Sequence, residues 1–465
     1  MCGWKRVPMS RIDVPVELNE PGAEAAPLKP VAPVAPVASV APGEAERAGG
    51  RRATLAQRFW TLQASHLVID IYPIFFTSLM LVLTERLALT EGQIVLLYAT
   101  GPVFSGLPQV FFAWATDRLD SRICGWLGLL VGSVSISSIG LAQNFWQLWA
   151  LQIVGMTCTG MYHPIGAALS GQLGGRLKGA GGRGWGVSIF YTAGMVGGFL
   201  GAIGSTRINT QAGMRGLLWL VAPGLLLSAL LWAAVRHIGH RHDNHREMHS
   251  SIPPEEARER WRTVALLFVG NVARFTVNTG LPVLFAVWAK SRLPEDVVRA
   301  TNLNGNMLAA LTVGMGVGGL LAGRLTPQGR EKGVMVVLSL LGAATVALCG
   351  FVGSWLGPWG IIVMSGFTAL GFAAVIPTTI SLAQRLLPGR TGLASGLMLG
   401  TSWGLSAAAP VMASWFLGSD LKSAYRLSPG RIDAAFIGFA VLLLAAAALA
   451  ALMPSGLLRR IADHH

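Results

Sequence analysis

This sequence contains few charged residues, and this feature says most about its class. Only 12% of its 465 residues are Asp, Glu, Lys or Arg, about half the share of an average soluble domain, whereas 52% are hydrophobic. Apolar stretches of roughly 20 residues recur from Thr61 almost to the C-terminus, and each can cross about 30 Å of hydrocarbon as a helix. Segments such as Gly333–Phe351 and Ile432–Met453 lack the polar stripe of a soluble helix. The composition argues against a soluble protein and predicts an all-α membrane protein.

Cysteine and nucleotide-binding motifs are scarce or missing as well. The four cysteines, Cys2, Cys124, Cys158 and Cys349, include no pair with metal or redox spacing. Acidic and Cys ligands at a fixed spacing do not accompany the five histidines of the central charged segment, which are His237, His240, His242, His245 and His249. We therefore expect no metal, no cofactor and no nucleotide as energy source.

The net charge of +14 does not indicate a nucleic-acid partner. Lys and Arg residues lie in short connections between apolar runs, without a basic face interleaved with aromatic residues. Their distribution favours one side of a membrane, because cytoplasmic loops carry an excess of positive residues. If the N-terminus is cytoplasmic, the connections on the cytoplasmic side carry the larger number of Lys and Arg residues. These include Arg118, Arg122, Arg176, Lys178, Arg183, Arg324, Arg330, Lys332, Arg385, Arg390, Arg459 and Arg460. This pattern predicts an even number of spans with both termini cytoplasmic.

The chain divides into four parts. Residues 1–55 include the Pro/Ala/Val-rich stretch Pro27–Pro42 and predict a disordered cytoplasmic tail rather than a signal peptide. Residues 56–236 and 262–465 each predict a half with six spans, and residues 237–261 predict a charged, His-rich cytoplasmic linker. The expected spans are 61–84, 92–115, 123–142, 147–170, 186–206, 216–236, 262–289, 302–323, 333–352, 357–384, 391–416 and 432–453.

The two halves resemble each other in sequence. Gly155 and Gly160 near the fourth span are echoed by Gly366 and Gly371 near the tenth. A longer pattern returns with identical internal spacing, since Gly182, Arg183, Ser188 and Gly197 are echoed by Gly389, Arg390, Ser395 and Gly404. A repeat of this kind, with a charged linker between its copies, is typical of a duplicated six-plus-six transporter.

Several motifs give the chain a family resemblance. The most specific is AQRLLPGRTGLASGLMLG from Ala383 to Gly400. Others are Ser65-His66 with Asp70, Leu89-Thr90 with Gln93-Ile94, Ala115-Thr116-Asp117-Arg118, Tyr162-His163-Pro164 and Ser188-Ile189-Phe190. From about Ser65 to Met453 the chain resembles the major facilitator superfamily and, within it, the fosmidomycin resistance protein group of bacterial drug efflux transporters.

The chain also departs from this pattern. Ala113 stands where the superfamily loop motif expects Gly, and the second-half copy near Gly323-Arg324 has no acidic residue. Gly201-Ala202 replaces the Gly-Pro of the antiporter motif, and Ile165-Gly166 replaces polar residues that the subgroup has after His-Pro. These departures weaken the inference of a gating network, of export and of a drug substrate.

The resemblance implies a secondary active transporter, not an enzyme, that moves a small molecule by alternating access. The expected activity is proton-coupled efflux of a drug or metabolite, by a monomer in the inner cell membrane in contact with lipid. One alternative is a uniporter or importer of a small organic anion. Another is a membrane sensor or scaffold that no longer transports.

Charged groups at membrane depth are costly unless they are paired or hydrated, so each is a functional candidate. His66 and Asp70 are four residues apart and share one face of the first span, and His163 lies deep in the fourth. These three are the proton-coupling candidates, with structural pairing or packing as the alternative. In the seventh span Arg274 lies between Asn271 and Asn278, and with Tyr72 these form the expected contacts to a small-molecule substrate, for which an organic anion is one candidate. Pairing of Arg274 with Asp70 is the alternative.

A second group of residues suits a gate or a helix contact. Asp117, Arg118 and Arg122 lie in the loop motif after the second span, and Arg183 and Arg390 begin the fifth and eleventh spans. They either hold one conformation or simply anchor the cytoplasmic side. Glycines of the fifth span form a small-residue face for packing or sliding: Gly194, Gly197, Gly198, Gly201 and Gly204.

Overall fold

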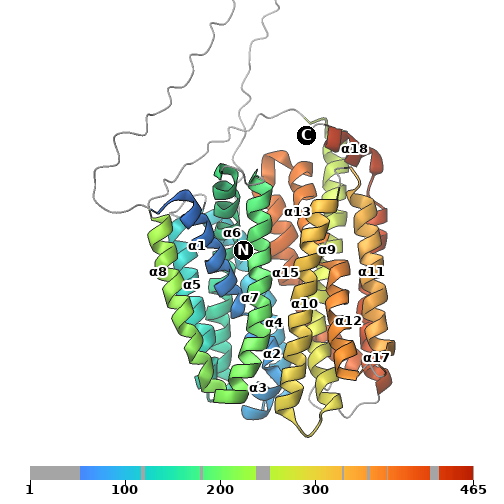
Figure 1. Cartoon of the computed structure of the whole chain (residues 1–465). Coiled ribbons are helices and arrows are strands. Elements are labelled where there is room, and N and C mark those ends of the chain that lie inside the picture. Colours follow the sequence, from blue (N-terminus) through green and yellow to red (C-terminus); the bar gives the residue numbers. More distant parts are fainter. Residues whose placement is uncertain are drawn as a thin grey trace, which may run out of the picture. The chain divides into compact units, whose positions relative to one another are not determined.

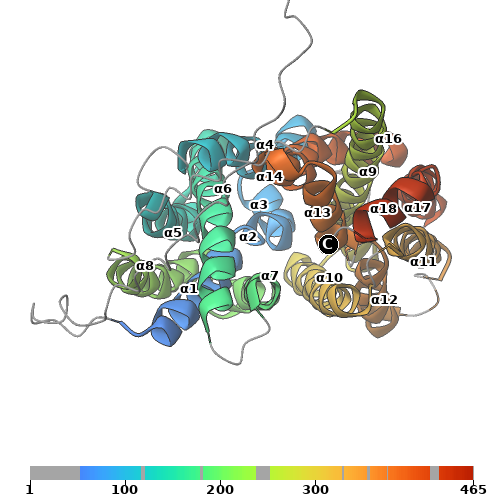
Figure 2. The same cartoon turned by 90° about the horizontal axis from the view of Figure 1, so that it is seen from above.

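The regular structure of the protein is helical. The computed structural model describes residues 53–116, 121–177, 182–236, 252–326, 329–352, 355, 357–373, 375–418 and 429–463, and among these it contains only helices and their connections (Figure 1). Residues from Arg52 onward form one compact unit, in which the helices lie in two groups side by side (Figure 2). Helix α1 begins at one end of this bundle, where α18 also lies, and we call this the terminal end. The other end, where α3 lies, is called the opposite end.

The helices of the first half follow one another through the bundle from end to end. They are α1 (Leu55–Ile71), α2 (Phe75–Ser78), α3 (Met80–Arg86), α4 (Glu91–Thr116), α5 (Ser121–Ser137), the 3-10 helix η1 (Ser138–Leu141), α6 (Phe145–Arg176), α7 (Gly182–Ala212), the 3-10 helix η2 (Met214–Leu220) and α8 (Val221–Val235).

The second half is more segmented, because its tenth and eleventh spans are divided. Its helices are α9 (Pro254–Arg292), α10 (Val297–Leu325), α11 (Glu331–Val352), α12 (Gly357–Phe372), α13 (Val375–Leu386), η3 (Pro388–Arg390), α14 (Thr391–Ser395), the π-helix η4 (Gly396–Thr401), α15 (Ser402–Leu405), η5 (Ser406–Ala408), α16 (Ala409–Leu417), α17 (Pro429–Ala451) and α18 (Ser455–Asp463).

Each of the twelve expected spans coincides with one of these helices or with a run of them. Within the described residues, seven helices are long and apolar enough to cross a membrane by themselves, and the bent run from α1 to α3 raises the number to eight. The remaining spans are shorter, interrupted or less apolar, as in the run from α14 to α16. The prediction of an all-α membrane protein is confirmed, and the helices are consistent with the twelve expected spans.

The start of the second half differs from the expected boundary. Helix α9 begins at Pro254, inside the segment expected to be a linker. Proline suits the first turn of a helix, and Glu255 and Glu256 in that turn complement the positive end of its dipole. Charged residues outside a membrane can continue a helix, which hydropathy alone does not indicate. The five linker histidines lie outside the described residues.

Exposed tryptophans mark both ends of the bundle. Trp60, Trp232 and Trp261 lie in the parts of α1, α8 and α9 near the terminal end. Trp146, Trp219, Trp359 and Trp415 lie near the opposite end, at the start of α6, in η2, at the start of α12 and in α16. Tryptophan is enriched at both interfaces of a membrane, so this distribution fits a bundle that spans one.

Helix α7 presents glycine on two of its faces. A Cβ added at Gly194, Gly197 or Gly201 would overlap α1, at the side chains of His66 and Asp70 or at the carbonyls of Leu67 and Ile71. At Gly198 it would instead crowd Thr312 of α10 in the other half, at 3.1 Å. At Gly204 it would meet nothing within 4 Å. Three of the five predicted glycines therefore bring α7 against α1, where the ionisable side chains lie.

Candidate functional site

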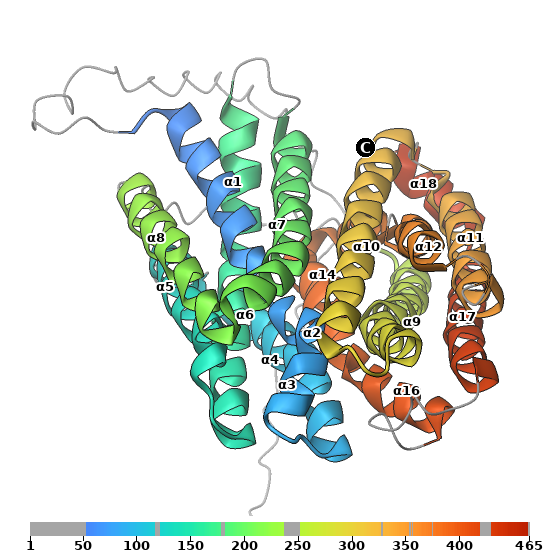
Figure 3. The ribbon, with the colours of Figure 1, turned by 60° about the horizontal axis from the view of Figure 1, so that its bottom comes forward.

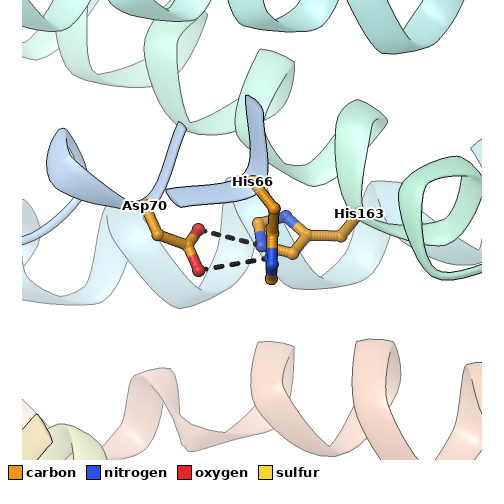
Figure 4. Close-up of side chains that lie close together, drawn as sticks. All are labelled: His66, Asp70 and His163. Atoms are coloured by element: carbon orange, nitrogen blue, oxygen red, sulfur yellow. Dashed lines mark hydrogen bonds and ion pairs between the residues drawn. The ribbon is translucent and has the colours of Figure 1, made fainter. Parts of the chain in front are cut away.

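The three proton-coupling candidates lie together inside the first half. Helix α1 supplies His66 and Asp70, and α6 supplies His163 (Figure 4). His66 Nε2 is 3.3 Å from one carboxylate oxygen of Asp70, and His163 Nε2 is 3.0 Å from the other. The exposed fractions of the side chains are 4% for His66, 16% for Asp70 and 29% for His163. The exposed fraction thus rises from His66 to His163, so His163 is the member that water reaches best.

Backbone carbonyls fix how the two imidazoles are protonated. His66 Nδ1 is 2.6 Å from the Phe190 carbonyl of α7, and His163 Nδ1 is 2.7 Å from the Thr159 carbonyl of its own helix. A carbonyl oxygen can only accept a hydrogen bond, so each Nδ1 carries the proton and donates it. Each Nε2 is left to face the carboxylate, with or without a second proton.

The contact between His163 and Asp70 requires a shared proton. An unprotonated Nε2 and an ionised carboxylate are both acceptors, and at 3.0 Å they would repel each other. One proton between them gives either a neutral acid beside a neutral imidazole or a carboxylate beside an imidazolium. The pair of residues has a net charge of zero in both forms. The geometry of this contact is that of a hydrogen bond.

His66 faces the second carboxylate oxygen differently. Its Nε2 is buried and has no hydrogen-bond partner, although Asp70 Oδ2 is 3.3 Å away. This nitrogen therefore matches an unprotonated acceptor, and a second proton placed there would create a new hydrogen bond to Asp70. The cluster can hold one or two protons with little movement, and its net charge changes from zero to +1.

Neighbouring residues that the sequence reasoning did not select keep the cluster in place. The ring of Phe190 stacks on that of His66, with 3.5 Å between centroids. Tyr162 and Ser65 share a hydroxyl hydrogen bond of 2.6 Å beside it, and Gln63 donates to the Ser170 hydroxyl at 2.8 Å. The motifs Ser65-His66, Tyr162-His163 and Ser188-Ile189-Phe190 contain three of these residues but did not indicate the contacts, because a backbone carbonyl or a stacked ring leaves no pattern in sequence.

The same atoms are also a possible metal-ligand set. One ring nitrogen of each histidine and a carboxylate oxygen of Asp70 lie within 4.8 Å of one another, and this mixture of donors suits a divalent transition metal. The sequence reasoning expected no metal site and did not identify this set. The hydrogen-bond geometry of His163 and Asp70 favours a proton between them as the assignment of this site.

Arg274 lies apart from this cluster, in the interior of the second half. Its guanidinium is 1% exposed and donates to Ser339 Oγ of α11 at 3.1 and 3.2 Å and to Asn271 Oδ1 at 3.3 Å. Within the described residues, it forms an ion pair with no carboxylate. The structure therefore does not bring Arg274 together with Asp70, the alternative pairing considered above.

The other expected substrate contacts are also buried within their own halves. Asn271 donates to Thr379 Oγ1 at 2.8 Å and to the Met398 carbonyl at 3.3 Å, and Asn278 is 8% exposed. Tyr72 is fully buried and donates to the Leu220 carbonyl at 2.9 Å. Asn271 and Tyr72 thus form polar contacts between helices, each within its own half.

The expected gate residues are only partly described. Asp117 and Arg118 lie outside the described residues, while Arg122 lies in α5 and Arg183 in α7. Arg390 ends η3 and is exposed at the terminal end. Their role in a gate stays a prediction.

A bundle of long apolar helices with a buried ionisable cluster fits a multi-pass membrane transporter rather than an enzyme. Comparison with known proteins agrees. The chain belongs to the Major Facilitator Superfamily, whose family model matches residues 67–411.

Individual relatives are distant. The chain is 25% identical to the fosmidomycin resistance protein of Escherichia coli (strain K12) over 355 residues, which cover 74% of this chain and 82% of the relative. It is 23% identical to the uncharacterized MFS-type transporter YfnC of Bacillus subtilis (strain 168) over 379 residues, covering 80% and 88%. The resemblance predicted from the sequence motifs is confirmed.

Solved structures show the same fold. A bacterial homologue of the human drug peptide transporters PepT1 and PepT2 matches with a TM-score of 0.66 at 13% identity, covering 88% of this chain and 100% of that one. A bacterial homolog of the human lysosomal transporter Spinster, in an inward-facing and unoccupied conformation, matches with a TM-score of 0.64 at 16% identity, covering 89% and 99%.

Proposed function

We propose that the protein is a proton-coupled secondary transporter that exports a drug or metabolite across the inner cell membrane, with both termini in the cytoplasm. The observation that carries the proposal is the hydrogen bond between His163 and Asp70, which requires a proton inside the membrane-spanning part of the chain. The excess of positive residues on one set of loops supports the orientation. The name of the Escherichia coli relative supports drug export.

The proton count of the cluster suggests how coupling works. With one shared proton the three side chains are neutral together, and a neutral site costs less to enclose in a low-dielectric interior than a charged one. Gain or loss of a proton charges the cluster and favours the state in which water reaches it. Proton binding on one side and release on the other would therefore bias the two conformations of the transporter.

The contacts of Arg274 give less support to uniport of an organic anion. In that alternative the guanidinium binds the substrate directly. Here Ser339 and Asn271 already accept from it, and the side chain lies within the second half. We therefore keep export coupled to protons as the single candidate.

The decisive test is the replacement Asp70→Asn. Asparagine keeps the shape of the protonated acid but cannot release a proton. We expect the variant to insert into membranes and to exchange substrate for substrate, but to lose accumulation driven by a pH gradient. Everted vesicles, with and without an imposed gradient, measure this for compounds first found by a growth panel that includes fosmidomycin.

Asp296→Asn is the matched control, because Asp296 lies at the start of α10 and pairs with Arg299 on the same helix at 3.4 Å. It should transport like the unaltered chain. Gradient-driven transport by Asp70→Asn at the unaltered rate would show that Asp70 is not the coupling site.

A further inference from the structure

The first span is broken near the opposite end of the bundle. The axis turns by 54° between the segments Leu55–Ser78 and Met80–Arg86. Because α2 ends at Ser78 and α3 begins at Met80, carbonyl groups at the end of α2 are without the N–H groups of a following turn. In Figure 3, α2 and α3 lie at this end between the two groups of helices, beside α10.

Side chains of the second half bind this broken segment. Asn304 of α10 is fully buried, and its Nδ2 donates to the carbonyls of Thr77 at 2.9 Å and Ser78 at 3.3 Å. At the end of α9, Lys290 Nζ forms an ion pair with Glu85 of α3 at 2.7 Å. One contact acts on the carbonyls exposed by the break, and the other acts on the short helix beyond it.

We propose that Asn304, Lys290 and Glu85, with the carbonyls of Thr77 and Ser78, form a clamp that holds α2 and α3 closed over the opposite end, and that the clamp opens when the transporter exposes its interior there. This proposal rests on the alternating access that the proposed function requires. We call this set of contacts the α3 clamp.

Two features of the α3 clamp favour a contact that can break. Asn304 Oδ1 is buried without a hydrogen-bond donor, which lowers the net stability of the closed end. Glu85 remains half exposed, so water can solvate its carboxylate when the ion pair separates.

Neighbouring contacts at the same end show what is particular to the clamp. Asn302, two residues before Asn304, also bridges the halves, but its partner is the Thr210 hydroxyl of α7 at 3.0 Å. A hydroxyl can donate or accept, whereas a backbone carbonyl can only accept. The same change at the two asparagines should therefore have different effects, which supplies a matched control.

The test measures how far the opposite end opens, without substrate or gradient. Spin labels are attached at Gln143 and Glu295, which are exposed at this end on different halves, in a full-length chain whose four cysteines are replaced by alanine. Pulsed electron paramagnetic resonance then gives the populations of short and long label distances in the purified protein.

Asn304→Asp replaces the donating amide by an oxygen that repels both carbonyls, so the long-distance population should rise relative to the short one by roughly tenfold or more. Glu85→Gln should raise the same ratio by roughly threefold. Asn302→Asp should leave it nearly unchanged, because Thr210 can turn its hydroxyl to donate, and Asp296→Asn should have no effect.

Equal responses of Asn304→Asp and Asn302→Asp would overturn the clamp, as would unchanged distances in Asn304→Asp. If Asn304→Asp does not fold, Asn304→Ser and Glu85→Gln give the same measurement with smaller expected shifts, and unchanged distances in both would also overturn it. The label distances test the clamp, whereas transport by Asp70→Asn tests proton coupling. Either hypothesis can therefore be overturned while the other is supported.

Discussion

The two halves of the protein share one structural device, but it lies beside groups of changeable charge in one half and beside a constant charge in the other. In the first half, a side chain of its first helix donates to a backbone carbonyl of its fifth span, from His66 to Phe190. In the second half, Asn271 does the same to Met398. Beside His66 stand Asp70 and His163, which can change their charge together. Beside Asn271 stands Arg274, a permanent cation with neutral partners.

We infer from this difference that the two halves have different roles in the transport cycle. In the proposed mechanism the first half carries the groups that gain and lose a proton, so its preferred conformation would depend on the proton concentration. The second half carries a buried charge that stays constant and is held by hydroxyl and amide oxygens. Substitutions in the first half should therefore change proton-coupled transport, whereas substitutions at the buried charge of the second half should change mainly the stability of the protein.

The largest effect should follow from Gly194→Ala in the first half. A Cβ at this position overlaps the Asp70 carboxylate and the His66 ring, so it must displace the cluster or separate α7 from α1. We expect destabilisation of about 1–3 kcal/mol and loss of gradient-driven transport. Thermal unfolding in detergent and vesicle transport measure both. Gly204→Ala, with open space around it, is the control, and an equal response of the two variants would contradict the prediction.

The next largest effect concerns the two histidines. His163→Gln removes the partner that shares the proton with Asp70, whereas His66→Gln removes an imidazole whose Nε2 is unpartnered. We expect His163→Gln to abolish the pH dependence of transport between about pH 5 and 8, and His66→Gln to shift it without abolishing it. Initial rates at a series of external pH values would decide. A flat profile for His66→Gln alone would reverse the assigned roles.

In the second half, Arg274→Lys should affect stability more than coupling. An ammonium cannot reproduce the fork that donates to Ser339 and Asn271 together. We expect a loss of about 1–3 kcal/mol in the free energy of unfolding, with the pH profile of the surviving protein unchanged. Ser339→Ala should show a smaller loss of the same kind. If Arg274→Lys is stable but transports with a weaker apparent affinity, the guanidinium binds substrate after all.

The smallest effect should come from deletion of residues 1–50, which belong to neither half. Their composition offers too few patterned apolar residues to form a core, so the truncated chain should fold and transport normally. Membrane yield, thermal unfolding and transport of the truncated chain give the comparison. Loss of any of them at normal expression would point to targeting or regulation by the tail.

Much of the fold was predictable because hydropathy and glycine spacing report the spans directly. The approach of His66 to Asp70 was also predictable, since residues four apart share a helix face. The contact of His163 with Asp70 needed the crossing of α1 and α6, which periodicity does not give. The direction of Arg274 was not predictable for the same reason: a helical wheel defines its face but does not tell which neighbouring helix that face meets.

The π-helix η4 has a consequence for the duplication itself. Gly197 and Gly404 occupy the same place in the repeated pattern, yet Gly197 meets α1 in its own half and Gly404 meets Leu107 of α4 in the other half. Between Ser395 and Gly404 the chain winds through one wider turn, whereas α7 is regular over the matching stretch. One additional residue in a turn rotates everything after it by about 100°. Equal spacing in the two copies thus yields different faces, so Gly404 packs on the other half although Gly197 packs within its own.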